Sequence, residues 1–391
     1  MKIIIVEDKL SKNLQPFTYT RRVSRIRIGP FSLERFLQLA LPGIEIEFAR
    51  SAKVEPAVSI TGGAVVLNAR VVPCKELIDA LYGQTSSFIF SQGGKSSSVP
   101  ALGERNKAGG RGQAVSGSRD FGDFILIENC WDIIKYGEKS LESTFPWQIK
   151  NMRRHLKQKL VYLGKKVKID PWVKFDTSMG PIILADEVVI DPFVILQGPL
   201  YIGPKTVVKS HSMIGPFVST GLQVKLGGEV AHSVIESYSN KAHHGFIGHS
   251  YIGSWVNIGA GTSNSNLKNT YGNVRVIQNN KKVDTGMQFL GCMIADYAKT
   301  AVNTSLYTGK VVGVAGMCYG VVAVNVPSFA HSTSKGLFEV DLEAVIKMQA
   351  RMMHRREIKP NEEDVALIKS AYAVSAEERK KAGVKKGAVR F

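Results

Sequence analysis

The 391-residue chain has few cysteines, few aromatic residues and no long apolar run. Its four cysteines (Cys74, Cys130, Cys292 and Cys318) lie far apart, and no two of them form a CxxC pair. This spacing excludes a cysteine-rich zinc framework and predicts reduced, mostly buried thiols in a cytoplasmic protein. No apolar run approaches the roughly 18 residues that a membrane span needs, so no membrane partner is expected.

Acidic residues are also scarce, since 33 acidic residues face 51 basic ones and the net charge is +18. The basic residues concentrate between Met152 and Lys168 and in the tail from Arg351 to Arg390. A solvated basic face, attraction of polyanionic small molecules and nucleic-acid binding would each account for this charge. The chain has neither zinc-finger spacing nor an RNP-type aromatic pattern, so nucleic acid is the weakest of the three explanations.

Residues 1–150 have the pattern of a mixed α/β domain. Apolar runs at Ile3–Val6 and Ala64–Leu67 predict strands, whereas Phe31–Leu39 and Lys75–Leu81 predict helices. Within this domain, residues 91–119 are rich in Gly, Ser and Lys, which predicts a mobile loop.

A basic helical connector is expected at residues 151–168, and from 169 to 327 the sequence changes character. Glycine and β-branched residues dominate there, and aliphatic residues recur at every sixth position. Six of them stand in unbroken register: Leu184, Ile190, Leu196, Ile202, Val208 and Ile214.

The six-residue period has a direct structural meaning. Each repeat supplies one short strand and one bend, and three repeats close a triangular coil whose aliphatic residues point inward. Small residues such as Gly203 often follow the aliphatic one, and we expect them where the bend requires a φ that bulky residues avoid. The pattern therefore predicts a left-handed parallel β-helix. In residues 328–391 the period becomes helical, which predicts helices that cap the end of the β-helix, followed by a basic tail.

The repeat is interrupted between Thr220 and Phe246, where we expect a protruding loop that carries function. Five of the eight histidines lie between residues 211 and 249. Chemistry is therefore expected in and beside this segment.

Several motifs in the repeat region resemble a known family. The run Asn257–Thr262, with a Lys-x-His before Ile252-Gly253, resembles the acetyltransferase half of the bifunctional bacterial enzyme that makes UDP-N-acetylglucosamine. The match is closer to a divergent branch, the GlmU-related sugar nucleotidyltransferases and N-acetyltransferases. The motifs shared with that branch are Pro16–Arg21, Arg27–Gly29, Ser239–Lys241, Gly245–Ser250, Leu267–Asn269, Asp284–Gly286 and Gln288–Gly291.

This resemblance covers most of the chain and implies a reaction. It implies a nucleotidyltransferase-like domain followed by an acyltransferase β-helix, assembled as a homotrimer. It also implies a sugar phosphate or nucleotide sugar as substrate and acetyl-coenzyme A as co-substrate. His243 aligns with the general base that takes a proton from the attacking amine, and His244 is the alternative base. Expected substrate-binding residues are Lys225, Lys241, Asn257 and Lys268, and the acetyl-coenzyme A arm is expected at Ala260 and Gly261.

The chain departs from the family at several positions. Phe246 stands where the bifunctional enzyme has a tyrosine, and Val218–Gly221 replaces arginines that bind the sugar phosphate. The N-terminal domain lacks the glycine-rich nucleotide loop. Nucleotidyl transfer there would need Arg21 and Lys9 for the nucleotide, with Mg²⁺ held by carboxylates such as Glu7 and Asp8.

Two other functions stay open. The β-helix of γ-type carbonic anhydrases binds zinc through three histidines, and His244 and His249, with His243 or His232, have a suitable spacing. Alternatively, the β-helix is a catalytically inactive trimeric scaffold or ligand sensor.

Overall fold

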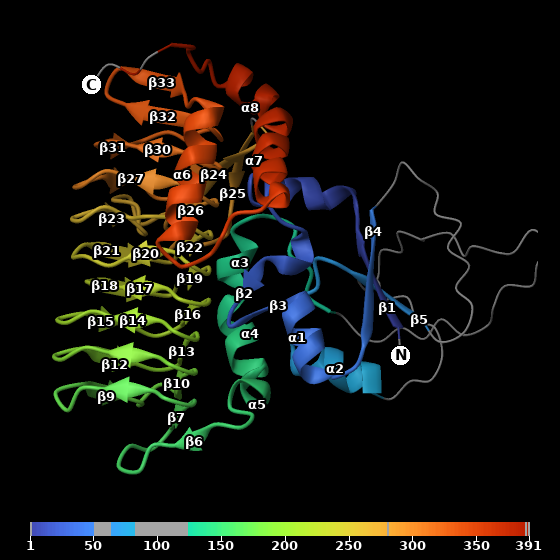
Figure 1. Ribbon diagram of the computed structural model, residues 1–391, viewed down its shortest axis with the longest axis vertical. Helices are drawn as coiled ribbons and strands as arrows, with labels where there is room; N and C mark the ends of the chain where they lie inside the picture. The colour runs from blue at the N-terminus through green and yellow to red at the C-terminus, as the bar shows by residue number, and fades with distance from the viewer. Residues whose placement is uncertain (1, 51–63, 83–123, 280, 388, 390–391) are drawn as a thin grey trace, which may run out of the picture.

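The computed structural model describes residues 2–50, 64–82, 124–279, 281–387 and 389. Figure 1 shows a tall β-helix, an α/β unit against one of its sides, and C-terminal helices beside its last coils. The loop expected at 91–119 lies outside the described residues.

The N-terminal unit is built on a small parallel sheet with the strand order β4-β1-β5. The strands and helices expected in this unit are confirmed at β1, β5, α1 and α2, and Ser32 caps α1 by accepting a hydrogen bond from the backbone of Arg35. The elements are β1 (Lys2–Glu7), the 3₁₀ helices η1 (Lys9–Leu14), η2 (Phe17–Tyr19) and η3 (Val23–Arg25), β2 (Arg27–Ile28), β3 (Phe31–Ser32), α1 (Leu33–Ala40), β4 (Glu45–Arg50), β5 (Ala64–Asn68), α2 (Lys75–Tyr82), α3 (Asp132–Lys135), α4 (Gly137–Ser143) and α5 (Phe145–Gln148).

The helical connector expected at 151–168 is wrong. Strand β6 (Arg153–Arg154) pairs antiparallel with β7 (Val161–Leu163), and β7 already forms the first rung of the β-helix by pairing with Ile182–Leu184. The three β7 residues are buried, so burial against the next coil decides their conformation, whatever the helix propensity of the surrounding lysines. The β-helix therefore starts before residue 169.

The β-helix has three faces of parallel strands, which Figure 1 shows as stacked rungs. Face one contains β7, β10 (Ile182–Leu184), β13 (Leu200–Ile202), β16 (Val218–Thr220), β19 (Val234–Ile235), β22 (Tyr251–Ile252), β26 (Met293–Ile294) and β29 (Val311–Val312). Face two contains β8 (Lys168–Ile169), β11 (Val189–Ile190), β14 (Val207–Val208), β17 (Lys225–Leu226), β20 (Asn240–Lys241), β27 (Lys299–Thr300), β30 (Met317–Cys318) and β32 (Ala330–Thr333). Strand β33 (Gly336–Glu339) ends this face by pairing antiparallel with β32. Face three contains β9 (Lys174–Asp176), β12 (Ile195–Gln197), β15 (Met213–Ile214), β18 (Glu229–Ala231), β21 (Phe246–Gly248), β23 (Ser263–Asn264), β28 (Ser305–Leu306) and β31 (Val321–Val322).

The predicted aliphatic column fills the interior of this prism. All six residues that set the period are at most 2% exposed and belong to one core cluster. Consecutive coils superpose them, because Leu184 pairs with Ile202 and Ile190 pairs with Val208. The predicted fold class is confirmed.

Our explanation for the small residues was wrong. The left-handed backbone falls on bulky residues three positions after the aliphatic one, such as Glu187, Phe193 and Lys205. Gly203 is small for a different reason: a Cβ placed on it would lie 2.2 Å from the carbonyl oxygen of Gly221 in the next coil. Close approach of stacked coils, and not φ, requires glycine at this position.

The functional loop expected between Thr220 and Phe246 is also wrong. The coil continues there through β17 to β20, but it is shorter: Ser219 pairs with Val234, 15 positions later, whereas Leu200 pairs with Val218, 18 positions later. Shortened corners broke the sequence period without producing a loop. The real insertion follows β23, and it forms the hairpin of β24 (Arg275–Gln278) and β25 (Lys281–Asp284).

The predicted C-terminal helices are present as α6 (Leu342–His354), α7 (Glu362–Val374) and α8 (Ala376–Lys381). Asp341 caps α6, and Asn361 with Asp364 forms a capping box on α7. Helix α6 runs back along the side of the β-helix, so the residues that follow it reach the coil of Asn240, where Arg356 donates a 2.7 Å hydrogen bond.

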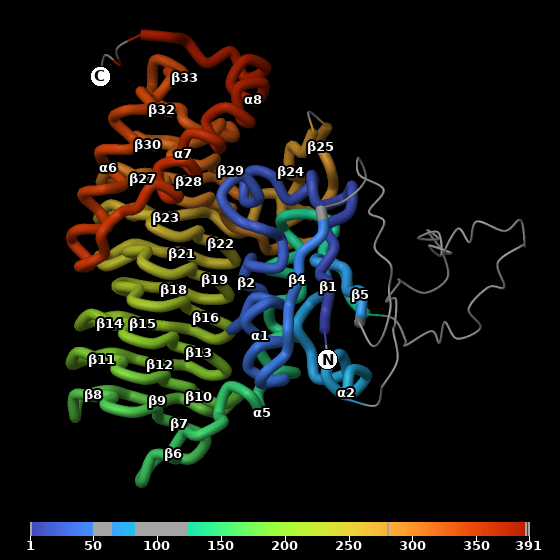
Figure 2. The backbone as a smooth tube through the Cα atoms, turned by 45° about the vertical axis from the view of Figure 1, so that its right-hand side comes forward, coloured from blue at the N-terminus to red at the C-terminus, as the bar shows by residue number. Residues whose placement is uncertain are grey.

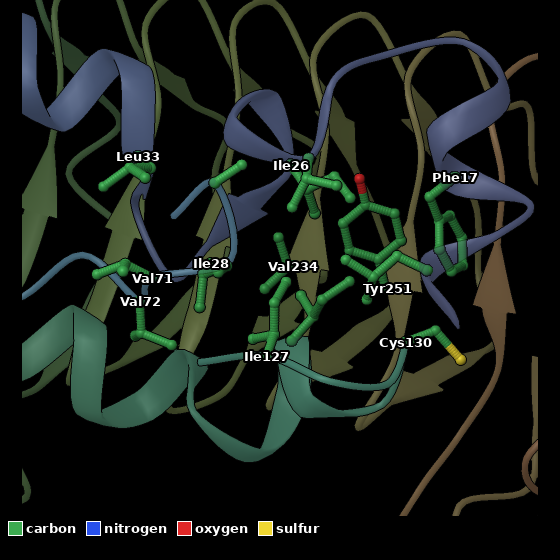
Figure 3. Close-up of a cluster of buried hydrophobic side chains, with 14 of the residues drawn as sticks. Phe17, Ile26, Ile28, Leu33, Val71, Val72, Ile127, Cys130, Val234 and Tyr251 are labelled. Atoms are coloured by element: carbon green, nitrogen blue, oxygen red, sulfur yellow. The ribbon is translucent and has the colours of Figure 1, made fainter. Parts of the chain in front are cut away.

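The N-terminal unit packs on face one through a continuous apolar interface. Figure 3 shows Val234 and Tyr251 of the β-helix among Phe17, Ile26 and other N-terminal side chains, and all four belong to one core cluster. Phe17 meets Tyr251 edge to face with ring centroids 4.9 Å apart. Figure 2 shows the N-terminal unit lying beside the coils of the β-helix.

Candidate functional site

Two of the predicted substrate residues lie in one row on face two. Lys225 pairs with Asn240, and Asn240 bridges to Asn257. Their neighbours Leu226 and Ile258 point into the core, so the three polar side chains point outward. Asn240 Nδ2 lies 3.4 Å from Asn257 Oδ1. We call this set the Lys225 row.

The Lys225 row is flanked by cations from other elements. Arg356 Nη2 donates to Asn240 Oδ1 at 2.7 Å. Desolvation by burial and the charges of Arg356, Arg355 and Lys209 lower the pKa of Lys225. The row is therefore a strongly positive polar surface.

Lys241 does not belong to this surface, so its predicted role in substrate binding is wrong. It pairs with Leu226 on an inward position and is only 2% exposed. Its Nζ donates to the carbonyl oxygens of Gly227, His243 and Gly245 at 2.6, 2.7 and 2.9 Å. Desolvation lowers its pKa to about 8. From inside the prism, Lys241 stabilises the corner that follows β20 by donating hydrogen bonds to its backbone carbonyl oxygens.

His243 and His244 form that corner, between face two and face three. Both side chains are exposed. The corner stacks on glycines of the previous coil: a Cβ on Gly227 would lie 2.3 Å from the Ala242 carbonyl oxygen, and Gly228 has φ +68°. These two glycines bring the histidines close to the surface of the coil below. We call residues 242–245 the histidine corner.

Ala260 and Gly261 lie at the equivalent corner of the next coil. The Gly261 N–H donates to the His244 carbonyl oxygen, and the Ala260 carbonyl accepts from the Asn303 N–H. A Cβ on Gly261 would lie 2.0 Å from Asn303 Oδ1 and 3.3 Å from His244 Nε2. The structure thus places the predicted acetyl-coenzyme A residues directly beside the histidine corner, although the Gly261 N–H is already used.

Lys268 lies apart from the Lys225 row, in the insertion between β23 and β24. Its Nζ donates to the Asn273 carbonyl oxygen at 3.0 Å. The structure therefore does not bring Lys268 together with Lys225 and Asn257.

A hollow of about 450 Å³ opens on face three beside the histidine corner. It is lined by His211, Met213, Gly228, Glu229, Gly245, Phe246 and Ser263. Phe246 contributes an apolar ring here, and Glu229 contributes a carboxylate. This space can hold a mixed polar and apolar group next to the histidines.

The histidines proposed for zinc do not form a three-ligand site within a single chain. Within the described residues no group of three His, Cys, Asp or Glu side chains could hold a metal ion. His232 and His249 instead stack with ring centroids 4.4 Å apart, and the Nδ1 of His249 lies 2.9 Å from the Asn266 amide nitrogen. Burial and the neighbouring His232 lower the pKa of His249 to about 4. These two rings act as packed parts of a corner.

Arg21, predicted to bind nucleotide, is paired with carboxylates of the β-helix. Its guanidinium lies 2.8 Å from Glu236 Oε1 and 2.5 Å from Asp296 Oδ1, and its side chain is 12% exposed. It lines a hollow of about 530 Å³ between the N-terminal unit, the coil corners and α7. Because two carboxylates already balance its charge, the geometry gives Arg21 a role in joining the two parts of the chain.

The other residues predicted to serve nucleotidyl transfer lie at the carboxyl ends of β1 and β5. Asp8 accepts hydrogen bonds from Arg70 and Asn68, and these bonds lower its pKa against the opposing effect of burial. Glu7 accepts from the Val23 N–H, and Lys9 is exposed. Asp8 is thus paired to the buried Arg70 guanidinium, and among the described residues no group of three or more His, Cys, Asp or Glu side chains could hold a metal ion.

Sequence reasoning missed Asn240, Arg355 and Arg356 as site residues. Asn240 was visible within the motif Ser239–Lys241, and its exposure follows from the strand alternation that buries Lys241. The two arginines were visible only as part of a basic tail. Their approach to face two depends on the path of α6, which no local pattern fixes.

The chain is similar to several known proteins. Residues 3–152 match the family model described as sugar nucleotidyl transferase. A bifunctional sugar-1-phosphate nucleotidylyltransferase/acetyltransferase of Sulfurisphaera tokodaii is 27% identical over 195 residues, which cover 49% of this chain and 48% of that protein. The bifunctional protein GlmU of Xylella fastidiosa (strain M23) is 29% identical over 173 residues, covering 39% and 36%. Among solved structures, a UDP-N-acetylglucosamine O-acyltransferase of Moraxella catarrhalis covers 58% of this chain and 99% of its own, with 14% identity and a TM-score of 0.28.

The predicted resemblance is therefore confirmed. The chain is similar to sugar nucleotidyl transferases over residues 3–152 and to bifunctional nucleotidylyltransferase/acetyltransferases over 39–49% of its length. The matched stretches span between about a third and a half of these curated relatives' own length. Among the described helices, none is long and apolar enough to cross a membrane.

Proposed function

We propose that this protein is an N-acetyltransferase that acts on an amino-sugar phosphate in nucleotide-sugar synthesis of the UDP-N-acetylglucosamine type in the cytoplasm. Acetyl-coenzyme A is the acetyl donor, and His243 is the general base. The observation that carries this proposal is that Asn240 of the Lys225 row and the histidine corner lie on the same coil. Asn240 of the row precedes His243 by three residues, so their Cα atoms lie within about 11 Å of one another.

This spacing lets one small substrate reach both places. A phosphate held by the Lys225 row leaves the sugar amine to approach the histidine corner. A neutral His243 imidazole takes a proton from the amine as its nitrogen attacks the thioester carbonyl. A C–N bond forms and the C–S bond breaks, so the products are the acetamide and coenzyme A, which leaves with its thiol. Names of the relatives support the acetyl group as the one transferred.

The test is thiol release from acetyl-coenzyme A in the presence of several amino-sugar phosphates. We expect release that depends on the sugar and that falls roughly 10²- to 10⁴-fold in His243→Asn, the usual contribution of a general base. His244→Asn decides between the two neighbouring histidines, and His354→Asn on α6 is the matched control.

Absence of release by folded wild-type protein would contradict the acetyltransferase. An inactive scaffold or ligand sensor would then remain.

A second activity, transfer of a nucleotidyl group to a sugar 1-phosphate, is favoured by the family match over residues 3–152 and by the parallel sheet. Ligands of open α/β sheets bind at the carboxyl ends of the strands, where Asp8, Asn68 and Arg70 meet. We expect pyrophosphate release from a nucleoside triphosphate and a sugar 1-phosphate, unchanged in His243→Asn. A folded protein that releases no pyrophosphate with any nucleotide would contradict this second activity.

We also propose a homotrimer in which face three meets another copy. Ile195 and Met213 expose apolar side chains on this face at 36% and 38%, next to the hollow that Phe246 lines. Sedimentation velocity should give three times the chain mass of 42.8 kDa. A monomer at micromolar concentration would contradict the assembly.

A further inference from the structure

The cations around the Lys225 row form a cluster with little opposing charge. Arg355, Arg356 and Lys209 all lie close enough to lower the pKa of Lys225 through their charges. Of these four side chains, Lys209 has an ion pair, at 2.8 Å from Asp191. Repulsion among neighbouring like charges is unfavourable, and a bound anion relieves it. Such a cluster of cations therefore favours the binding of an anion.

Arg356 is the most informative member. It is half-buried, and burial and the charge of Arg355 lower its pKa. The described residues give its guanidinium no carboxylate partner; its hydrogen bond goes to the uncharged Asn240 Oδ1. A desolvated guanidinium with donor N–H groups to spare is suited to bidentate binding of a phosphate.

Strand β16 on face one, where the resembled family has arginines that bind the sugar phosphate, cannot supply cations to this cluster. Val218–Thr220 is buried beneath the N-terminal unit, and Ser219 Oγ donates to the Gly29 carbonyl oxygen at 2.7 Å. A long cationic side chain from this strand could not reach face two. The C-terminal segment after α6 supplies cations to face two from outside the coil.

We propose that Arg355 and Arg356 complete a phosphomonoester site with Lys225 on face two. The proposal rests on the proposed function for the choice of ligands. The phosphomonoester is carried either by the amino sugar or by the ribose 3′-position of coenzyme A, and both present the same dianionic group. Arg356 binds it through charge-assisted hydrogen bonds, Lys225 neutralises it, and Asn240 orients the guanidinium.

The experiment measures binding by isothermal titration calorimetry, without any turnover. The probes are glucosamine 1-phosphate, glucosamine, coenzyme A and dephospho-coenzyme A. Arg356→Gln and Lys225→Gln should each weaken one phosphomonoester probe by roughly 10- to 100-fold, the range for one charge-assisted hydrogen bond. The matching probe without the phosphomonoester should change less than about twofold. Whichever pair shows the difference identifies the source of the phosphate.

Lys168→Gln is the matched control, because Lys168 is an exposed lysine of face two three strands away from Lys225. It should leave all four affinities unchanged. Arg356→Lys keeps the charge but loses the planar donor pair, and it should recover part of the affinity.

Two outcomes would overturn the proposal. In the first, the Arg356→Gln and Lys225→Gln variants bind every probe like wild type, or wild type binds neither phosphomonoester at millimolar concentration. In the second, Arg356→Gln lowers the melting temperature and weakens all probes alike, which means that Arg356 only fastens α6 to the β-helix. If wild type shows the expected phosphate dependence but releases no thiol, the acetyltransferase proposal fails and the phosphomonoester site stands.

Discussion

The buried charge network around Arg21 yields the sharpest prediction. Arg21 bridges Glu236 and Asp296, whose side chains are 6% and 7% exposed, and Thr20 Oγ1 donates to Asp296 at 2.6 Å. The network joins the N-terminal unit to the β-helix. We predict that Arg21→Met destabilises the protein strongly, since it leaves two carboxylates buried without their shared cation.

The magnitude follows from the remaining partners. Removing one member of a buried ion pair costs about 3–5 kcal/mol. Glu236 keeps the Arg27 guanidinium at 3.5 Å and the Tyr251 hydroxyl at 3.1 Å, so the lower end of that range applies. The expected loss in the free energy of unfolding is about 3 kcal/mol. Arg25→Met breaks an ion pair with Glu34 in which Arg25 is 56% exposed, and it should cost at most about 1 kcal/mol.

Urea unfolding followed by circular dichroism measures both variants. A third variant, Arg21→Met with Glu236→Gln and Asp296→Asn, removes the buried charges together and should recover much of the loss. If Arg21→Met costs no more than Arg25→Met, the carboxylates are not held by Arg21 in the way described. A loss that the triple variant does not relieve would show that packing, and not charge, is responsible.

Three further predictions concern the β-helix. Lys241→Met should lower the free energy of unfolding by about 2–4 kcal/mol because three carbonyl oxygens lose their donor, whereas a substrate role would raise KM at unchanged stability in urea melts. Burial and the neighbouring His232 lower the pKa of His249 from 6.5 to about 4. The contribution of the neutral His249 ring to the free energy of unfolding is therefore fully present above pH 6.5 and is lost as the pH falls towards 4. His249→Phe should therefore flatten the melting temperature between those pH values, and a curve parallel to wild type would refute this. Gly203→Ala should cost about 1–3 kcal/mol in urea because its Cβ would meet a carbonyl of the next coil. Gly272→Ala, whose Cβ would meet only Lys268 Nζ at an ordinary 3.7 Å, should change stability by less than about 0.5 kcal/mol, and equal effects would contradict the packing argument.

Stability should also depend on pH through Glu236. Burial alone would raise the pKa of this carboxyl, but Arg21 and Arg27 overcome burial and lower it. A carboxyl whose pKa is lowered on folding contributes stability above its unfolded pKa, and that contribution is lost as the pH falls through the folded pKa. Wild type should thus lose stability in acid more steeply than Glu236→Gln, measured by urea midpoints between pH 3 and pH 6. Parallel midpoints would refute this origin.

The sequence by itself determined the β-helix. A period of six in aliphatic residues leaves one arrangement in which every member of the column is buried, and the structure buries all six members, from Leu184 to Ile214, in that way. Helices α1 and α2 of the N-terminal unit followed from their apolar spacing, and the family resemblance singled out His243, Asn257 and Lys225 as candidate site residues. These properties are local or periodic, so the sequence can carry them.

Only the tertiary structure decided which of the expected residues face the solvent together. Lys241 was expected on the surface, yet a one-residue register difference from Asn240 places it inside the prism. Arg21 was expected to bind nucleotide, yet Glu236 and Asp296 from distant coils take up its charge. Arg356 reached Asn240 only because α6 runs back along the coils. Contacts between segments far apart in the chain depend on how whole elements pack, and burial of the combined surface, not any local pattern, sets that packing.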